Sequence, residues 1–194
     1  MRQLNINIAE LIDLWKQSPP LLPVSISTNL SSATMATEKS NPNNTAYFLY
    51  TGEGGERVPG WVSHVRVDPT ITAIPEGAFQ YRPRLKYVEL CEGRLRVIGR
   101  AAFFDCESLE RIKIPFMVEI IPEGAFQHCG KLIEVELCRG LKEIGMHAFD
   151  GCTSLDRINI PSTVKSIGKS AFFNSLSSLE LPDGIENIGD YAFS

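Results

Sequence analysis

The stretch that decides the fold reads Leu109-Glu-Arg-Ile-Lys-Ile-Pro-Phe-Met-Val-Glu-Ile-Ile-Pro-Glu-Gly-Ala-Phe-Gln-His-Cys129. Variants of it recur through the C-terminal part of the chain. An Ala-Phe pair marks each copy, with a usual period of 23 residues: Ala78-Phe79, Ala102-Phe103, Ala125-Phe126, Ala148-Phe149, Ala171-Phe172 and Ala192-Phe193. Leucines keep the same phase at Leu85, Leu109, Leu132, Leu155 and Leu176, and isoleucines at Ile74, Ile98, Ile121, Ile144, Ile167 and Ile188. A fixed period of this length with phased apolar positions predicts a solenoid, in which each repeat buries its apolar face against its neighbours.

Each repeat contains two extended edges and one turn. Alternation after Leu109 sends Ile112 and Ile114 inward and leaves Arg111 and Lys113 outward, as in a half-solvated strand. The proline that follows ends the strand, and residues 118–121 form a second extended edge. The segment 122–129 opens with Pro-Glu, which favours a single helical or 3₁₀ turn. Its alanine lets Phe126 stack on the phenylalanine of the next repeat.

The repeat resembles the leucine-rich repeats of the BspA-like type, whose unit reads L-x-x-I-x-I-P-x-x-V-x-x-I-G-x-x-A-F-x-x-C. The resemblance covers 61–194, and residues 155–172 match almost every fixed position. It implies a curved solenoid with a parallel sheet on one face, a role in protein or surface binding, and no enzymatic activity. Cys91 and Cys138 replace the proline after the strand, while Arg82 and Ser175 replace the ladder cysteine. The fold class expected is an α/β solenoid, mostly β and irregular, with short parallel strands on one face and short helical or 3₁₀ turns.

Four segments follow from these patterns. Residues 1–17 form an amphipathic helix with one apolar face made of Leu4, Ile8, Leu11, Ile12 and Trp15. Residues 18–45, rich in Ser, Thr, Asn and Pro, form a flexible linker. Residues 46–61 form a strand and a turn that cap the first repeat, and residues 62–194 form about six repeats, the last of them incomplete. The helix either docks on another protein or packs on the solenoid itself.

Composition narrows the choice of partner. The 194 residues carry a net charge of −4, which gives no electrostatic reason to expect nucleic acid. No apolar run approaches the length of a membrane span, and no secretory signal follows Arg2. These absences, together with cysteines that we interpret as free thiols, favour an intracellular location.

The outward strand positions form the candidate protein-binding face. It comprises His64, Arg66, Tyr87, Glu89, Arg111, Lys113, Glu134, Glu136, Arg157 and Asn159, with Ser178 and Glu180 continuing the two columns. Charges alternate in sign from strand to strand. The columns are therefore either self-neutralising ladders on a soluble sheet or a mixed-charge surface that binds a protein.

The five cysteines and three histidines suggest no chemistry. Cys106, Cys129 and Cys152 occupy equivalent positions, so we expect a column of buried thiols whose parallel side chains disfavour a disulfide. His128 lies beside Cys129, but the absence of a Cys-x-x-Cys pair disfavours zinc. The histidines fall in different phases of the repeat, without a matching nucleophile or carboxylate. We therefore expect no catalytic residues, no metal and no cofactor.

The last copy ends at Ala192-Phe193-Ser194 without a polar cap. The expectation is either a fragment of a longer array or end-to-end self-association through the uncovered repeat. The function predicted from the sequence is a non-enzymatic scaffold that binds an unidentified protein through its strand face. The alternative is a structural or adhesive repeat protein of the cell surface.

Overall fold

The structure is a computed structural model that describes residues 38–40 and 46–194. The expected helix at 1–17 lies outside the described residues, as does most of the expected linker at 18–45. The elements are β1 (Glu38–Ser40), β2 (Ala46–Tyr50), the 3₁₀ turn η1 (Glu53–Gly55), β3 (His64–Val67), β4 (Ala73–Ile74), β5 (Tyr87–Glu89), β6 (Val97–Ile98), β7 (Arg111–Lys113), β8 (Ile120–Ile121), β9 (Glu134–Glu136), β10 (Glu143–Ile144), β11 (Ser166–Ile167) and β12 (Asn187–Ile188).

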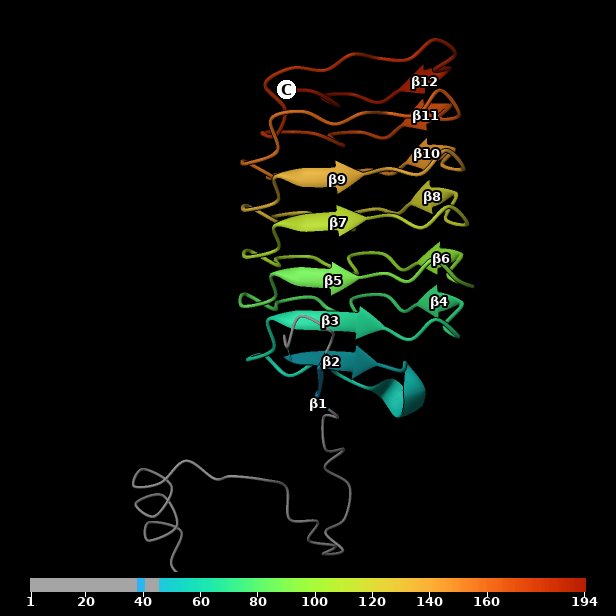
Figure 1. Cartoon of the computed structure of the whole chain (residues 1–194). Coiled ribbons are helices and arrows are strands. Elements are labelled where there is room, and N and C mark those ends of the chain that lie inside the picture. The colour runs from blue at the N-terminus through green and yellow to red at the C-terminus, as the bar shows by residue number, and fades with distance from the viewer. Residues whose placement is uncertain (1–37, 41–45) are drawn as a thin grey trace, which may run out of the picture. The chain divides into compact units, whose positions relative to one another are not determined.

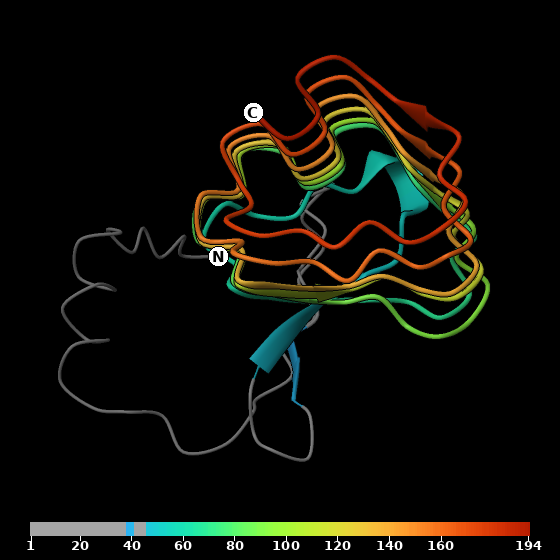
Figure 2. The same cartoon turned by 90° about the horizontal axis from the view of Figure 1, so that it is seen from above.

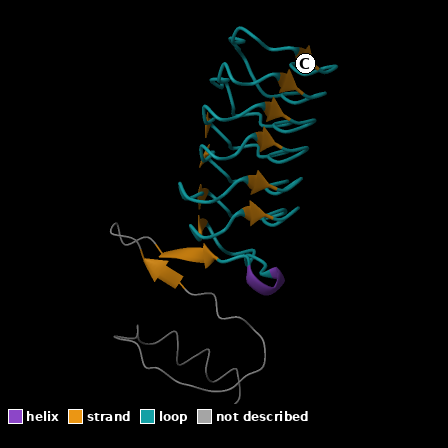
Figure 3. Ribbon diagram, turned by 90° about the vertical axis from the view of Figure 1, so that its right-hand side faces the viewer, coloured by secondary structure: helices purple, strands orange, loops and turns teal. Residues whose placement is uncertain are grey.

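The strands stack into a β-solenoid, which confirms the repeat prediction (Figure 1). One face carries a sheet in the order β1-β2-β3-β5-β7-β9, parallel except for the antiparallel pair β1–β2. The opposite edge carries two short parallel sheets, β4-β6 and β8-β10-β11-β12. Figure 3 shows how little helix the coil contains. The central residues of β3, β5, β7 and β9 are buried valines and an isoleucine, whereas their neighbours point outward.

The segment 122–129 and its equivalents form turns instead of the expected helical or 3₁₀ turns. Gly124 and His128 both have a φ of 62°, and the equivalent Gly77 and Tyr81 have 60° and 56°. An α-helix or a 3₁₀-helix requires negative φ throughout, so the positive φ of these residues prevents a helix from forming. These turns also direct some backbone N–H groups along the coil axis. For example, Phe103 N–H donates to the Ala125 carbonyl over 2.8 Å. The turns therefore satisfy their backbone both between repeats and within one repeat, where Ala125 N–H donates to the Pro122 carbonyl over 3.2 Å.

A column of phenylalanines runs inside these turns. Phe79, Phe103, Phe126, Phe149 and Phe172 are almost fully buried, and their rings stack at centroid distances of 4.9–5.3 Å. Tyr50 of β2 extends the column at one end, 4.8 Å from the ring of Phe79. Burying a large apolar side chain contributes about 1.5–3 kcal/mol, so each ring of this column stabilises the coil by an amount of this order.

The thiol column is also present. Cys106, Cys129 and Cys152 are free and fully buried, and each thiol donates to a phenylalanine carbonyl of the preceding repeat. Burial raises the pKa of Cys106 and of Cys152 to about 12. Cys91 and Cys138 are free thiols, as expected, but they are only half-buried. Their position after the strand, where other repeats have proline, lies at the edge of the core.

The strand ladder ends at β9, although the sequence predicted strands at 155–160 and 176–181 as well. Leu176 follows Phe172 by only four positions, whereas the leucine of the other repeats follows the phenylalanine by six, as Leu155 follows Phe149. Segments 155–160 and 176–181 are nonetheless joined to each other, since the Asp156 carbonyl accepts hydrogen bonds from the backbone of Ser177 and Ser178. Viewed from above, the orange and red traces of the last two repeats lie inside the green and yellow traces on the side of the strand face and outside them on the opposite side (Figure 2).

The N-terminal end of the sheet differs from expectation at one point. Strand β2 forms where the sequence predicts a strand and pairs in parallel with β3. Strand β1 lies within the range 18–45 that was expected to be a linker, and it pairs with β2 through Glu38, Lys39 and Ser40. The edge of β2 that faces away from β3 offers unpaired backbone groups, and β1 forms hydrogen bonds with them. The polar composition of residues 18–45 did not indicate this pairing.

Candidate protein-binding face

Eight of the ten predicted face residues project from the six-stranded sheet. His64, Tyr87, Arg111 and Glu134 form one column, and Arg66, Glu89, Lys113 and Glu136 form the other. The parallel register places each residue directly beside its equivalent in the next strand. Arg157 and Asn159 do not belong to the sheet, because residues 155–160 form no strand.

The first two strands of the face carry aromatic contacts. The rings of His64 and Tyr87 lie 4.8 Å apart, and the Ser63 hydroxyl lies 2.9 Å from His64 Nδ1. Tyr87 donates its hydroxyl to Glu110 over 2.8 Å, and this hydrogen bond raises the pKa of Tyr87. Partial burial lowers the pKa of His64, and the charge of Lys86 adds to the effect. Both effects favour the neutral form of His64, so this corner presents two aromatic rings.

The next strands carry ion pairs. Arg111 lies 3.3 Å from Glu134, and Lys113 lies 3.3 Å from Glu136 and 3.4 Å from Glu92. The hydrogen bond to Glu136 is the main cause that raises the pKa of Lys113. Arg66 pairs with Glu89 at 3.5 Å in the same way. These side chains are exposed, so the pairs contribute little to stability, and the charges remain available to a partner.

A shallow hollow of about 400 Å³ lies along this part of the face. Its walls are the charged side chains of both columns, and Val88, Leu90 and Ile112 also line it. Tyr87 lies at its rim and is 40 % exposed. An apolar floor within a charged rim is the common composition of a protein interface.

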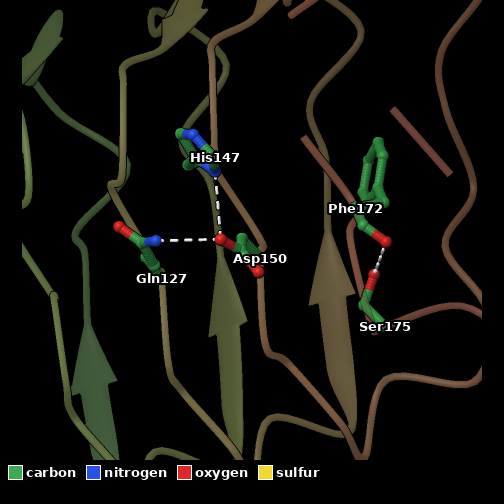
Figure 4. Close-up of polar contacts among 5 residues, drawn as sticks. All are labelled: Gln127, His147, Asp150, Phe172 and Ser175. Atoms are coloured by element: carbon green, nitrogen blue, oxygen red, sulfur yellow. Dashed lines mark hydrogen bonds and ion pairs between the residues drawn. The ribbon is translucent and has the colours of Figure 1, made fainter. Parts of the chain in front are cut away.

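One polar network was missed by the sequence analysis. His147 Nδ1 lies 3.0 Å from Asp150 Oδ2, and the same oxygen accepts a hydrogen bond from the Gln127 amide over 2.9 Å (Figure 4). The histidines were expected to lack a carboxylate partner, which is wrong for His147. The sequence shows the three-residue spacing between His147 and Asp150, but it does not reveal the turn that brings the two side chains together. The network links one repeat to the next, with Asp150 largely buried.

Figure 4 also shows how the last repeat departs from the thiol column. Ser175 replaces the ladder cysteine and donates its hydroxyl to the carbonyl of Phe172, in its own repeat, over 2.7 Å. Cys152, in contrast, donates to Phe126 of the preceding repeat. Ser175 therefore lacks the side-chain hydrogen bond to the preceding repeat that the ladder cysteines form.

Across 38–40 and 46–194, no three His, Cys, Asp or Glu side chains come together in a way that could hold a metal ion. Within that part of the chain, no helix has the length and hydropathy needed to cross a bilayer.

A parallel coil with a leucine-phased strand face and a phenylalanine turn column defines a leucine-rich repeat protein. Comparison with protein families identifies the type: residues 72–194 match the BspA type leucine rich repeat region in six copies. The chain belongs to this family.

Solved structures of similar proteins support the fold. A leucine-rich repeat protein from Bacteroides ovatus is 31 % identical, with a TM-score of 0.62 over 69 % of this chain and 34 % of the other. The pneumococcal vaccine antigen PcpA is 26 % identical, with a TM-score of 0.59 over 71 % of this chain and 34 % of the other. The leucine rich repeat protein of T. pallidum is 25 % identical, with a TM-score of 0.51 over 85 % of this chain and 66 % of the other.

The matched region thus spans about a third of the length of the first two of these proteins and 66 % of the third. A search of curated proteins gives no match.

Proposed function

We propose that the chain is a non-enzymatic leucine-rich repeat module that binds a protein partner through the sheet β2-β3-β5-β7-β9. The observation that carries this proposal is the hollow along β5, β7 and β9, with exposed charges at its rim and apolar side chains among its lining. Rigid strands hold these side chains in register, so binding would cost little conformational entropy.

The absence of catalysis is part of the proposal. The family is a structural repeat, and the repeat pattern accounts for the positions of Cys106, Cys129 and Cys152 inside the coil. The pair His147–Asp150 binds Gln127 and links two repeats, which gives it a structural role.

The comparisons favour one setting for this module, which is a structural or adhesive repeat at a cell surface. One of the similar solved structures is a pneumococcal vaccine antigen, and this supports the surface setting more than an intracellular scaffold. Protease treatment of intact cells tests the setting. Cleavage of the protein on intact cells supports a surface role, whereas cleavage only after lysis supports the intracellular scaffold.

Capture of a partner with matched variants tests the face. The double variant Tyr87→Ala/Lys113→Ala removes the rim of the hollow, and Glu119→Ala/Lys142→Ala removes an exposed ion pair at the opposite edge of the coil. We expect the first variant to lose a partner that the second retains, at unchanged melting temperature. Equal capture by both variants would contradict the proposed face.

A further inference from the structure

The end of the strand ladder leaves an open backbone edge on β9. Within the described residues, no backbone hydrogen bond joins 133–137 to 155–160, although β9 pairs with β7 on its other side. Glu134 N–H donates to Glu110, and the Glu136 carbonyl accepts from Ile114, so both residues bond towards β7. By the alternation of a parallel ladder, the N–H and C=O of Val135 point to the opposite side, towards the last two repeats.

Two hollows adjoin this edge. One of about 390 Å³ lies at the start of β9 and is lined by Ile133, Val135, Arg157 and Asn159 among others. The other, of about 530 Å³, lies at the end of β9 and is lined by Leu137, Arg139, Asn159 and Pro161 among others. Because Val135, Glu134 and Asn159 line both, the hollows form one ledge along the strand. We call it the β9 ledge.

Two cations on the ledge have no ionic partner among residues 38–40 and 46–194. Glu134 and Glu136 form exposed ion pairs with Arg111 and Lys113, which do not line the ledge. Asp156, the third acidic residue, accepts a hydrogen bond from the Ser177 hydroxyl and keeps its charge, so the two arginines exceed it by one positive charge. In the described part of the chain, Arg139 and Arg157 form no ion pair, and both are exposed, one at each end of the ledge.

We propose that the β9 ledge binds an extended acidic segment of a partner protein, which adds to β9 as a further strand. The segment's backbone would bond to Val135, and acidic side chains at its two ends would pair with Arg139 and Arg157. An open strand edge provides hydrogen bonds for affinity, and flanking side chains provide specificity. This inference rests on the proposed function in that the ligand is a protein, and it names the chemistry of that ligand.

A fluorescent peptide with the core Glu-Val-Thr-Val-Glu tests the inference by polarisation on the full chain. We expect saturable binding, and a loss of about tenfold in affinity for Arg139→Gln/Arg157→Gln, since each exposed ion pair contributes up to about 1 kcal/mol. The control Arg96→Gln/Arg100→Gln removes two exposed arginines that do not line the ledge and should bind as the unmodified chain does.

Two altered peptides separate strand addition from simple charge attraction. Methyl groups on every second peptide nitrogen remove the N–H donors from one edge of the bound strand and leave the charge unchanged. Of the two peptides made in this way, methylated at the odd or at the even residues, only the one with methyl groups facing β9 should lose binding. A Gln-Val-Thr-Val-Gln core should bind about tenfold more weakly, because it keeps the backbone but lacks the charges. Equal binding of both methylated peptides, or equal competition by heparin, would overturn the inference.

Different experimental outcomes would refute the ledge inference and the proposed function. Absence of peptide binding, with partner capture still sensitive to Tyr87→Ala/Lys113→Ala, would refute the ledge and leave the face in place. Peptide binding that follows Arg139 and Arg157, with capture insensitive to the face variants, would support the ledge and refute the face.

Discussion

The phenylalanine column and the strand face are built from the same repeats, yet only the column continues to the end of the chain. Stacked rings extend from Phe79 to Phe193, with spacings that rise only from 4.9 to 5.8 Å. The parallel ladder of the strand face stops at β9, two repeats earlier. The column is interior, so a change there leaves a cavity, whereas strand residues point outward on every second position. The solenoid is therefore held by its turns, and its strand face tolerates variation.

Removing one ring from the column should have the largest effect. Phe126→Ala deletes a fully buried side chain between two stacked rings, at a cost of about 3–5 kcal/mol in the free energy of unfolding. Urea denaturation measures this loss. The control Phe116→Ala removes a ring that is 60 % exposed and should change stability by less than about 0.5 kcal/mol. Equal losses in the two variants would mean that the column does not dominate stability.

The thiols give a second contrast between interior and edge. A thiol reagent at pH 8 should modify Cys91 and Cys138 in the native protein, and all five cysteines only in denaturant. Burial raises the pKa of Cys106 and of Cys152 from 9.0 to about 12, so the unfolded chain loses these protons first as pH rises. Their contribution to stability is full below about pH 9 and is lost as pH approaches 12. Rapid modification of all five in the native state would contradict the buried column.

The sequence predicted the column better than the face, for a physical reason. The interior positions, such as Phe126 and Ile121, are fixed by packing and repeat in identity, so their register is visible without a structure. The turn geometry was not visible, because positive φ at His128 and Tyr81 occurs without glycine. The candidate binding residues Arg157 and Asn159 were predicted to lie on a strand because of the same apolar alternation that correctly placed Arg111 on β7.

Lengthening the segment between Phe172 and Leu176 tests why the strand ladder ends at β9. Inserting Thr-Ser between Ser175 and Leu176 restores the spacing found around Thr153 and Ser154. We expect residues 155–160 to join the ladder, the Val135 amide to exchange more slowly, and stability to rise by about 1 kcal/mol for the recovered hydrogen bonds. The same insertion between Gly54 and Gly55 should leave Val135 exchange unchanged. Unchanged exchange in the first variant would show that the shorter repeat is not the cause.

The smallest effect distinguishes the two parts of the strand face. Arg111 and Glu134 lie 3.3 Å apart on paired strands, so a double-mutant cycle to alanine should give a coupling of about 0.2–1 kcal/mol. Arg157 is the next residue of the same column after Glu134, but it lies beyond the end of the ladder. The cycle between Glu134 and Arg157 should therefore give no coupling. Coupling of similar size in both cycles would mean that the charge ladder continues past β9, and Arg157 would then be unavailable to an acidic ligand.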